Sequence, residues 1–461
     1  MSEGGTSTKW WDLRRFIAVL REHGALNEFR KEVDPVHELG ALLHASEQSG
    51  KAALFHRVAG HEIPVMGSAL GSHERIALAL ECEQDEIFDR VQSAKAQVLK
   101  PEQISAPAAC QEVRRSLVDL SALPVPTHAP KDGGPYLNAG IVIARDPVGG
   151  RHNLTFIRMQ VYGPDLVGVN INLWRDMREF FQQAEASGEN LPFCAAFGVD
   201  PALLMAAAFR YDGDEYEIAG ALRGAPVPVV QALTCEVLVP ALAEIVMEGE
   251  VLAGERREEG PMAEFTGHYS GTTQQPVGRI TSISHRKEPI FQTIAGASYE
   301  HLILGNALTR EPLLDTEVRK ISPRVKSVHL PPFGSGFTAI VSLGGPRPGE
   351  PISVGIAALS SHVNIKTVVL VDEDVDIFQP AEVAWALSTR VRWDRDCVVI
   401  PGAQGNDLDP SSDAQAVQAK VLVDATLGDD RKRSRPYERV RYPTIDVREF
   451  LGGTTDPDAG P

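Results

Sequence analysis

A change of sequence pattern near residue 100 is the feature that most restricts how this chain can fold. Segments of helical and strand character alternate up to that point, and prolines then follow at positions 101, 107, 124, 126 and 130. Proline fixes φ and removes a backbone donor, so this density of prolines interrupts regular structure. From Leu137 to about Ile294, strand-like segments dominate. The pattern predicts a domain boundary within the proline-rich stretch.

The first region, residues 1–115, is expected to be an α/β unit. Asp12 can cap a helix that Gly24 ends. Between these two residues, apolar side chains recur at helical spacing: Leu13, Phe16, Ile17 and Leu20. Two apolar strand segments and a further helix are predicted at Ala52–Phe55, Ile63–Met66 and Ala77–Leu80.

The central region, residues 116–305, has the pattern of an antiparallel, barrel-like sheet. Its segments rich in β-branched residues are separated by turns and lie at Gly140–Ala144, Leu154–Val161 and Val227–Leu238.

The last region, residues 306–461, is expected to be a second α/β unit that ends in a polar tail. Thr367–Val371 and Val398–Ile400 are predicted as buried strands flanking a helix at Pro380–Val391, where Pro380 suits the first turn. The whole chain is therefore predicted to be a mixed α/β protein: an N-terminal α/β region, a central split β-barrel and a C-terminal α/β domain.

Charge and composition exclude several classes of protein. The 461 residues include 45 Lys and Arg against 62 Asp and Glu, a net charge of −17. This balance argues against nucleic acid or an anionic membrane as a partner, because both need clustered basic residues. The 43% hydrophobic content excludes disorder as the main state. The uncharged run from Ser327 to Pro346 is broken by prolines and glycines, so it is not expected to span a membrane.

The compartment is predicted from the cysteines and the first residues. The 5 cysteines are far apart and form no CxxC pair, which favours reduced thiols over disulfides or zinc ligands. The start of the chain lacks the apolar core of a signal peptide. We therefore expect a cytoplasmic protein.

Common nucleotide-binding, protease and hydrolase motifs are missing from the sequence. The candidate functional residues are therefore isolated polar residues. The sequence contains no GxxxxGK[ST], GxGxxG after a strand, HExxH or GxSxG motif. Glu259 and Glu264 stand five apart across a Gly-Pro turn. Two carboxylates held close together can have their pKa values driven apart, giving one proton carrier and one charge stabiliser. The alternative is that Glu259 belongs, with Glu255 and Glu258, to a solvated acidic loop.

Arg158 lies in a predicted strand, five residues after Asn153. Residues five apart point to opposite faces of a regular strand, so both meet one ligand only at a bulge or a strand end. The planar guanidinium suits a carboxylate substrate, whereas the alternative is an ion pair on the barrel surface. Asn153 and Glu215 carry oxygen ligands of the kind that hard cations prefer.

Several segments, in this order and spacing, resemble the UbiD family of decarboxylases, which use prenylated flavin mononucleotide. The resemblance runs from about Asp12 to Asp424. It is carried by Asp12-Leu-Arg-Arg-Phe-Ile-Ala-Val-Leu, Glu32-Val-Asp-Pro, Phe197-Gly-Val-Asp-Pro201, Ala219-Gly-Ala-Leu-Arg-Gly224, Ala243-Glu-Ile-Val-Met-Glu-Gly249, Glu259-Gly-Pro-Met-Ala-Glu264, Val371-Asp-Glu-Asp-Val-Asp-Ile377 and Trp385-Ala-Leu-Ser-Thr-Arg390.

The resemblance implies a catalytic set of Arg158, Glu259 and Glu264. Arg158 would bind the substrate carboxylate with Glu259 bonded to it, and Glu264 would deliver the proton that replaces carbon dioxide. The family's ligands for a divalent metal, Mn²⁺ or Mg²⁺, match Asn153 and Glu215, and K⁺ usually accompanies that metal under the flavin phosphate. By family position, the substrate pocket would include His301 and Leu304.

Two positions depart from the family pattern. Trp174 stands where the family has a metal-binding His, and indole cannot ligate a hard cation, so Asn172, Asn170 or water would have to substitute. Ser360 stands where a relative has a phosphate-binding Lys, which leaves the phosphate to Arg175, Lys366 or backbone amides.

The resemblance implies a reversible carboxy-lyase acting on a (hetero)aromatic or α,β-unsaturated carboxylic acid, with carbon dioxide as the other product. A separate UbiX-like flavin prenyltransferase would supply the cofactor. A homodimer formed through the C-terminal domain is expected, and a hexamer is the alternative. Two other functions stay open: a catalytically silent assembly subunit, suggested by Trp174, and an ordinary FMN oxidoreductase.

Overall fold

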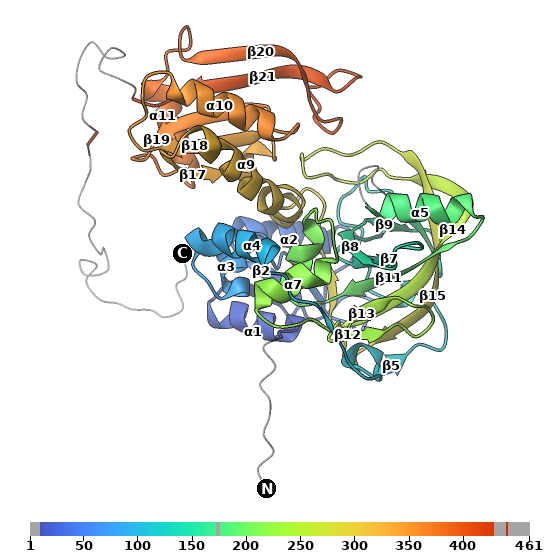
Figure 1. The fold of residues 1–461 in the computed structure, drawn as a ribbon. Helices are drawn as coiled ribbons and strands as arrows, with labels where there is room; N and C mark the ends of the chain where they lie inside the picture. Colours follow the sequence, from blue (N-terminus) through green and yellow to red (C-terminus); the bar gives the residue numbers. More distant parts are fainter. Residues whose placement is uncertain (1–9, 172–175, 428–438, 441–461) are drawn as a thin grey trace, which may run out of the picture.

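The computed structural model describes residues 10–171, 176–427, 439 and 440 (Figure 1). Its helices are α1 (Leu13–Glu22), α2 (Glu38–Gln48), α3 (His73–Leu80), α4 (Ile87–Ala96), α5 (Asp176–Ala186), α6 (Pro201–Ala208), α7 (Glu215–Arg223), α8 (Tyr299–Leu302), the π-helical turn η4 (Ile303–Ala307), α9 (Leu308–Ile321), α10 (Glu350–Ser361) and α11 (Pro380–Arg390).

The strands form four sheets, three of them in the body below the C-terminal unit of Figure 1. They are β1 (Leu26–Phe29), β2 (Ala52–Phe55), β3 (Val65–Gly67), β4 (Glu102–Gln103), β5 (Val113–Arg114), β6 (Tyr136–Leu137), β7 (Ile141–Arg145), β8 (His152–Phe156), β9 (Met159–Val161), β10 (Leu166–Val169), β11 (Leu191–Phe197), β12 (Pro228–Gln231), β13 (Leu238–Pro240), β14 (Ile245–Glu259), β15 (Thr273–His285), β16 (Phe291–Thr293), β17 (Val325–His329), β18 (Thr338–Leu343), β19 (Thr367–Asp372), β20 (Cys397–Gln404) and β21 (Val417–Asp424).

The N-terminal region folds as the sequence predicts. The side chain of Asp12 accepts a hydrogen bond from Arg15 N, 2.9 Å away, and caps α1. The sheet of this region has the order β1-β2-β3-β16, so the chain returns to it after the barrel is complete. The domain limits at residues 115 and 305 stay a prediction.

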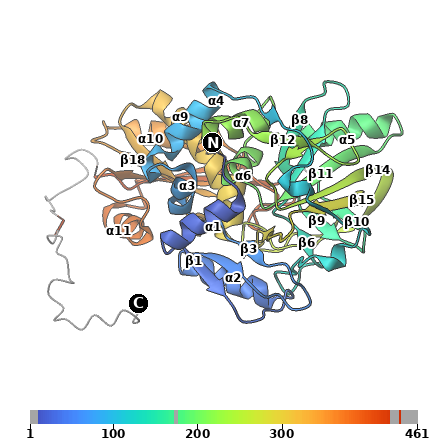
Figure 2. The same cartoon turned by 90° about the horizontal axis from the view of Figure 1, so that it is seen from below.

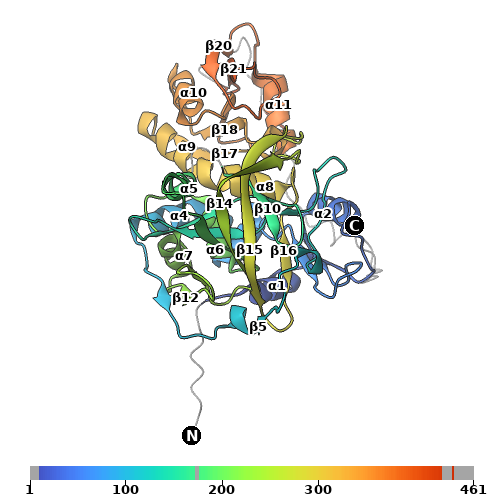
Figure 3. The same cartoon turned by 90° about the vertical axis from the view of Figure 1, so that its right-hand side faces the viewer.

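The central sheet is antiparallel and curled into a half-barrel around the long strands β14 and β15, which lie side by side in Figure 3. Its order is β6-β9-β10-β15-β14-β11-β7-β8, with β5 paired to β15. Strands β8 and β9 are consecutive in the chain yet lie in opposite arms of this sheet. Ile157 and Arg158, which connect them, therefore cross the open side of the half-barrel.

Two strand predictions in the central region are wrong in their extent. Leu154–Val161 is interrupted at residues 157 and 158, where the chain leaves one arm of the sheet for the other. Val227–Leu238 contains a turn between β12 and β13, which form a small separate sheet with β4.

The C-terminal unit has the sheet order β17-β18-β19-β21-β20, with helices on both faces. Alternate residues of β19 face opposite sides: Val368 and Leu370 pack in the core that includes α10, and Val369 and Val371 in the core that includes α11. In Figure 2 this unit lies beside the curled sheet, with α9 next to α4 between them. The predicted helix at Pro380 is confirmed.

The prediction that Val398–Ile400 is buried is wrong. These residues lie in β20, which among the described strands pairs only with β21, at the edge of the sheet, and Val399 is 57% exposed. An apolar run does not distinguish a central strand from an edge strand. Among the described residues, every helix is too short or too polar to cross a lipid bilayer.

Candidate active site

Arg158 is placed by the break between β8 and β9. Its carbonyl accepts a hydrogen bond from Asn170 N at 3.1 Å, which fixes the backbone at the open side of the half-barrel. The strand end that the sequence required for Arg158 and Asn153 to meet one ligand is therefore present.

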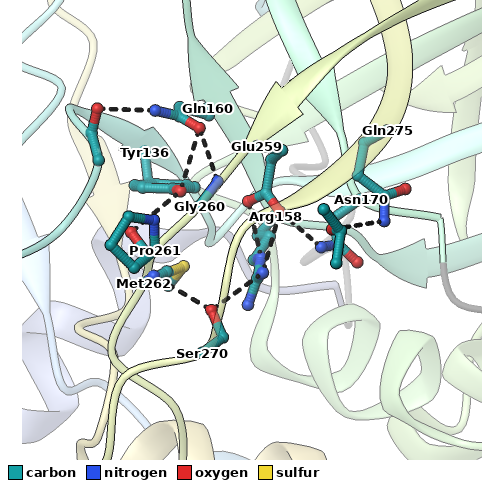
Figure 4. Close-up of polar contacts among 12 residues, drawn as sticks. Tyr136, Arg158, Gln160, Asn170, Glu259, Gly260, Pro261, Met262, Ser270 and Gln275 are labelled. Carbon is teal, nitrogen blue, oxygen red and sulfur yellow. Dashed lines mark hydrogen bonds and ion pairs between the residues drawn. The ribbon is translucent and has the colours of Figure 1, made fainter.

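The guanidinium of Arg158 makes a two-point ion pair with Glu259, the last residue of β14 (Figure 4). Nε lies 2.9 Å from Oε1 and Nη2 lies 3.0 Å from Oε2. Asn170 Nδ2 donates a further hydrogen bond of 2.8 Å to the Glu259 carboxylate, which is 0% exposed. Burial alone lowers the pKa of Arg158, but its bonds to Glu259 and the charges of both glutamates outweigh burial and raise it. The alternative of an ion pair on the barrel surface does not describe this buried arrangement.

Glu264 joins the same cluster. Arg158 Nη1 contacts Glu264 Oε1, and the Glu264 side chain is 12% exposed. The backbone N–H of Glu264 donates to His268 O at 2.8 Å, which closes a tight loop after the carboxylate. The alternative of a solvated acidic loop is wrong for Glu259, which is fully buried.

The turn between the two glutamates is clamped by polar groups that the sequence reasoning missed. Gln160 Oε1 accepts from Gly260 N at 3.0 Å, and its Nε2 donates to Gly133 O at 2.7 Å (Figure 4). Asp132 Oδ1 accepts from Ala263 N at 2.9 Å. The spacing in the sequence was one signal for Gln160. It stands two residues after Arg158, and residues two apart in a strand lie on the same face.

Close packing of glycines restricts the same turn from both sides. A Cβ on Gly133 would lie 2.4 Å from Gly260 O, and a Cβ on Gly296 would lie 2.2 Å from Ala263 O. Gly260 itself has φ of +98°, which L side chains rarely adopt. These contacts leave the turn little freedom, and this fixes the separation of Glu259 and Glu264.

His301 reaches the cluster from α8. Its ring meets the ring of Phe265 edge-on at 6.1 Å, and its Nδ1 is buried with no hydrogen-bond partner in the part of the chain that the structure describes. Burial lowers the pKa of His301, although the nearby Glu264 charge acts in the opposite direction. Leu304, one turn further in η4, is 3% exposed and packs in the core.

Asn153 and Glu215 meet at the other arm of the half-barrel. Asn153 Nδ2 lies 3.0 Å from Glu215 Oε1, and Leu154 N lies 2.8 Å from Glu215 Oε2. Burial raises the pKa of Glu215 to about 8. Asn153 Oδ1 and Thr155 Oγ1 are buried on one face of β8 and find no hydrogen-bond partner among the described residues. A buried carboxylate beside orphaned oxygens fits a hard cation, and alternation along the strand was the signal for Thr155.

Comparison with known proteins decides the family. Three family models of the 3-octaprenyl-4-hydroxybenzoate carboxy-lyase match successive parts of the chain: the N-terminal domain at residues 17–95, the Rift-related domain at 102–298 and the C-terminal domain at 304–425. The chain belongs to the UbiD family. The resemblance read from the sequence is thus confirmed.

Relatives of this UbiD-family chain include named decarboxylases. It is 34% identical over 417 residues to the anhydromevalonate phosphate decarboxylase of Methanothermobacter thermautotrophicus, which covers 90% of this chain and 96% of the relative. It is 34% identical over 446 residues to the phenolic acid decarboxylase of Bacillus subtilis, covering 90% and 92%. The UbiD-family chain is a carboxy-lyase, as its sequence predicts.

A solved structure shares the whole fold. HmfF of Pelotomaculum thermopropionicum, a UbiD-class enzyme in complex with FMN, matches with a TM-score of 0.91 at 38% identity, covering 96% of this chain and 100% of that one. An evolved dimeric form of HmfF in complex with prenylated FMN matches with a TM-score of 0.86 at 36% identity, covering 95% and 100%. The predicted mixed α/β fold is confirmed.

The remaining predicted cofactor residues are less directly placed. Lys366 precedes β19, and its Nζ lies 2.7 Å from Asp409 Oδ2 and 5.5 Å from the centre of the Phe337 ring. The ring of Phe337 packs against the ring of Phe265 at 5.9 Å, and Phe265 is the residue after Glu264. The rings of Phe337 and Phe265 therefore lie between Lys366 and the Glu264 segment. Trp174, Arg175 and Asn172 lie outside the described residues. Asn170, one of the suggested metal ligands, donates through its Nδ2 to Glu259.

Proposed function

We propose that this UbiD-family chain is a reversible, non-oxidative decarboxylase of a (hetero)aromatic or α,β-unsaturated carboxylic acid that uses prenylated FMN. The observation that carries the proposal is the single ion-paired cluster of Arg158, Glu259 and Glu264. Loss of carbon dioxide from an sp² carbon leaves electron density that no side chain accepts, and prenylated FMN supplies the electron sink when bound. The two acids and the guanidinium supply charge and the proton.

Asn153, Glu215 and Thr155 are the residues that would hold the cofactor through a cation. The flavin phosphate is anionic and would be repelled by a carboxylate, and a divalent ion such as Mn²⁺ or Mg²⁺ held by Glu215 would offset that repulsion. The orphaned Asn153 and Thr155 oxygens support this role. We extend the proposal to K⁺ beside the divalent ion, and to Arg158, Arg175 and Lys366 as further cofactor-binding residues.

The charges of the cluster suggest how substrate binding prepares the proton donor. Glu259 occupies the Nε–Nη2 edge of Arg158, and Glu264 occupies Nη1. One guanidinium already faces two carboxylates, so an anionic substrate can bind Arg158 only by displacing Glu264 from Nη1 or by proton uptake. The proton that Glu264 delivers is taken up from solvent when its carboxylate leaves Nη1 of Arg158.

The other side chains orient the reaction. Glu259 stays on Arg158 and holds the guanidinium edge toward the substrate carboxylate, while Glu264 protonates the carbon that carbon dioxide leaves. His301, neutral and with Nδ1 unpartnered, accepts or donates one hydrogen bond to a second polar group of the substrate. Leu304 supplies apolar surface.

Two features outside the site complete the proposal. A UbiX-like flavin prenyltransferase would supply the cofactor, and two copies of this chain would form a homodimer through the C-terminal unit. The exposed edge strand β20, with Val399 at 57% exposure, supports the second point because unpaired apolar edges favour association. Light scattering of the full chain tests the dimer against a monomer or hexamer.

Co-expression with a flavin prenyltransferase tests the function. The purified chain is expected to carry a modified flavin, identified by its mass, and to exchange solvent deuterium into the products of a panel of aromatic and acrylic acids. Bound unmodified FMN with reduction by nicotinamide would favour the oxidoreductase alternative. A flavin-free chain from the same cells would favour the assembly subunit.

A further inference from the structure

A second group of metal-ligand residues lies outside the active site, at a junction of three segments. His73 is the first residue of α3, Glu311 lies in α9 and His329 is the last residue of β17. The ligand atoms of the three side chains all lie within 4.8 Å of one another. Figure 1 shows that α9 links the C-terminal unit to the body that contains α3.

The carboxylate of Glu311 is the centre of this group. His73 Nε2 lies 2.9 Å from Oε2, and His329 Nδ1 lies 2.9 Å from Oε1. Leu330 N donates to Oε1 at 2.7 Å, which fixes the orientation of the carboxylate. The Glu311 side chain is 1% exposed, that of His329 6% and that of His73 20%, so the group is buried with one edge open to solvent.

We propose that His73, Glu311 and His329 bind a divalent transition-metal ion of the zinc class. Two imidazole nitrogens and one carboxylate oxygen form a ligand set that zinc takes in proteins, whereas magnesium and manganese prefer oxygen ligands. Ligands at about 2.0–2.1 Å from a tetrahedral ion lie roughly 3.3 Å from one another. The two 2.9 Å contacts involve different oxygens of Glu311, and the ligand atoms all lie within 4.8 Å of one another, so shifts of the three side chains would bring them to this spacing around one ion. Water completes the coordination, because no fourth His, Cys, Asp or Glu joins this group among the described residues.

The surroundings already orient the ligands. The rings of His73 and His329 meet edge-on at 5.6 Å, and His329 packs against Phe378 at 4.8 Å. Supporting contacts of this kind fix ring orientation around protein metal sites.

An ion at this site would restrain the helical segment that leads to the active site. His301 and Leu304 lie in α8 and η4, which continue directly into α9, so an ion at Glu311 ties this helical segment to α3 and β17. Binding to the assembled fold stabilises the assembled fold. The site is thus an interdomain tie, and it stands independently of the proposed reaction.

Zinc titration of the chelator-treated full-length chain tests the proposal. We expect one Zn²⁺ per chain to bind at this group, and Co²⁺ in its place to give the visible absorption of a tetrahedral site. Asn153→Ala, which alters the other candidate cation site, should retain this Zn²⁺. Loss of a ligand in His73→Ala should weaken binding by more than the roughly 10–100-fold that loss of an outer-shell partner costs.

Two variants guard the test against trivial explanations. His56→Ala removes the surface His56–Glu28 pair, whose atoms lie 2.7 Å apart, and should leave Zn²⁺ binding unchanged. Glu311→Gln should weaken Zn²⁺ binding as His73→Ala does. If Glu311→Gln fails to fold, His73→Ala still tests the proposal, because His73 is partly exposed. Wild-type affinity in His73→Ala, or a wild-type chain that binds no Zn²⁺, would show that the group is a hydrogen-bonded cluster without an ion.

Discussion

Arg158 and Glu259 face each other edge to edge, with Nε 2.9 Å from Oε1 and Nη2 3.0 Å from Oε2. They are far apart in sequence, on the strand break after β8 and at the end of β14, and the curl of the half-barrel brings them together. Because the buried Glu259 holds the guanidinium at two points, the fold itself sets its orientation. Preorganised charge of this kind lowers the barrier of a reaction more than charge that must be arranged during it.

Arg158→Ala should destabilise the fold as well as abolish carboxylate binding. It leaves the fully buried Glu259 carboxylate without its cation, and breaking a buried pair in this way costs about 3–5 kcal/mol. Denaturant unfolding measures the loss. Arg145→Ala, which removes an exposed pair with Glu236 at 2.8 Å, should cost about 1 kcal/mol or less. Equal losses in the two variants would contradict a buried, coupled pair.

Gly296→Ala should impair activity through the position of Glu264. The added Cβ would lie 2.2 Å from Ala263 O, so the backbone beside Glu264 must move. A displacement of about 1 Å at a catalytic group lowers kcat/KM by roughly 100-fold. Gly271→Ala is the matched control, since its Cβ would meet nothing within 4 Å. Similar kcat/KM values for the two variants would show that the clamp does not position the acid.

Asn153→Ala should lower the content of bound divalent metal and flavin together. The change removes a buried oxygen that the structure leaves without a partner. Elemental analysis and the flavin absorption of the purified chain measure both losses. The control is Asn190→Ala, which removes a surface Asn–Glu contact of 2.9 Å with Glu250. Full metal content in Asn153→Ala would place the cation elsewhere.

Glu300 should make stability fall as the pH rises. Burial raises the pKa of this fully buried carboxyl to about 8, against 4.5 for an ordinary Glu. Between these values the folded chain holds a proton that the unfolded chain releases, so the free energy of unfolding decreases with pH. From pH 5.5 to 7.5 the loss relative to Glu300→Gln should be roughly 2–3 kcal/mol. Glu317→Gln, at a partly exposed position, should track the wild type, and a pH-independent gap between wild type and Glu300→Gln would contradict the raised pKa.

Local sequence signals predicted local structure well. Asp12 and the start of α11 at Pro380 follow from capping and proline geometry, which depend on a few neighbouring residues. The edge position of β20 could not be predicted from the sequence, because Val398–Ile400 has the same apolar pattern whether one or two strands flank it. Strand order is set by contacts distant in sequence.

The candidate site likewise contains residues that the sequence indicates and residues that depend on contacts distant in sequence. The resemblance named Arg158, Glu259 and Glu264, and the fold brings them together. Residues that only support the site, such as Asp132 and Asn170, carry no motif, and their hydrogen bonds exist only once the barrel has formed. Supporting residues of this kind can be recognised only in the folded structure.

Deuterium exchange by Glu264→Gln tests the central claim most directly. The variant keeps the size of the side chain and removes its proton, so exchange of solvent deuterium into the product should fall by roughly 100- to 10,000-fold. Glu258→Gln, an exposed neighbour of Glu259, should exchange at the wild-type rate. Both variants should retain bound cofactor. Exchange by Glu264→Gln at the wild-type rate would contradict the account, because the proton would then come from another group.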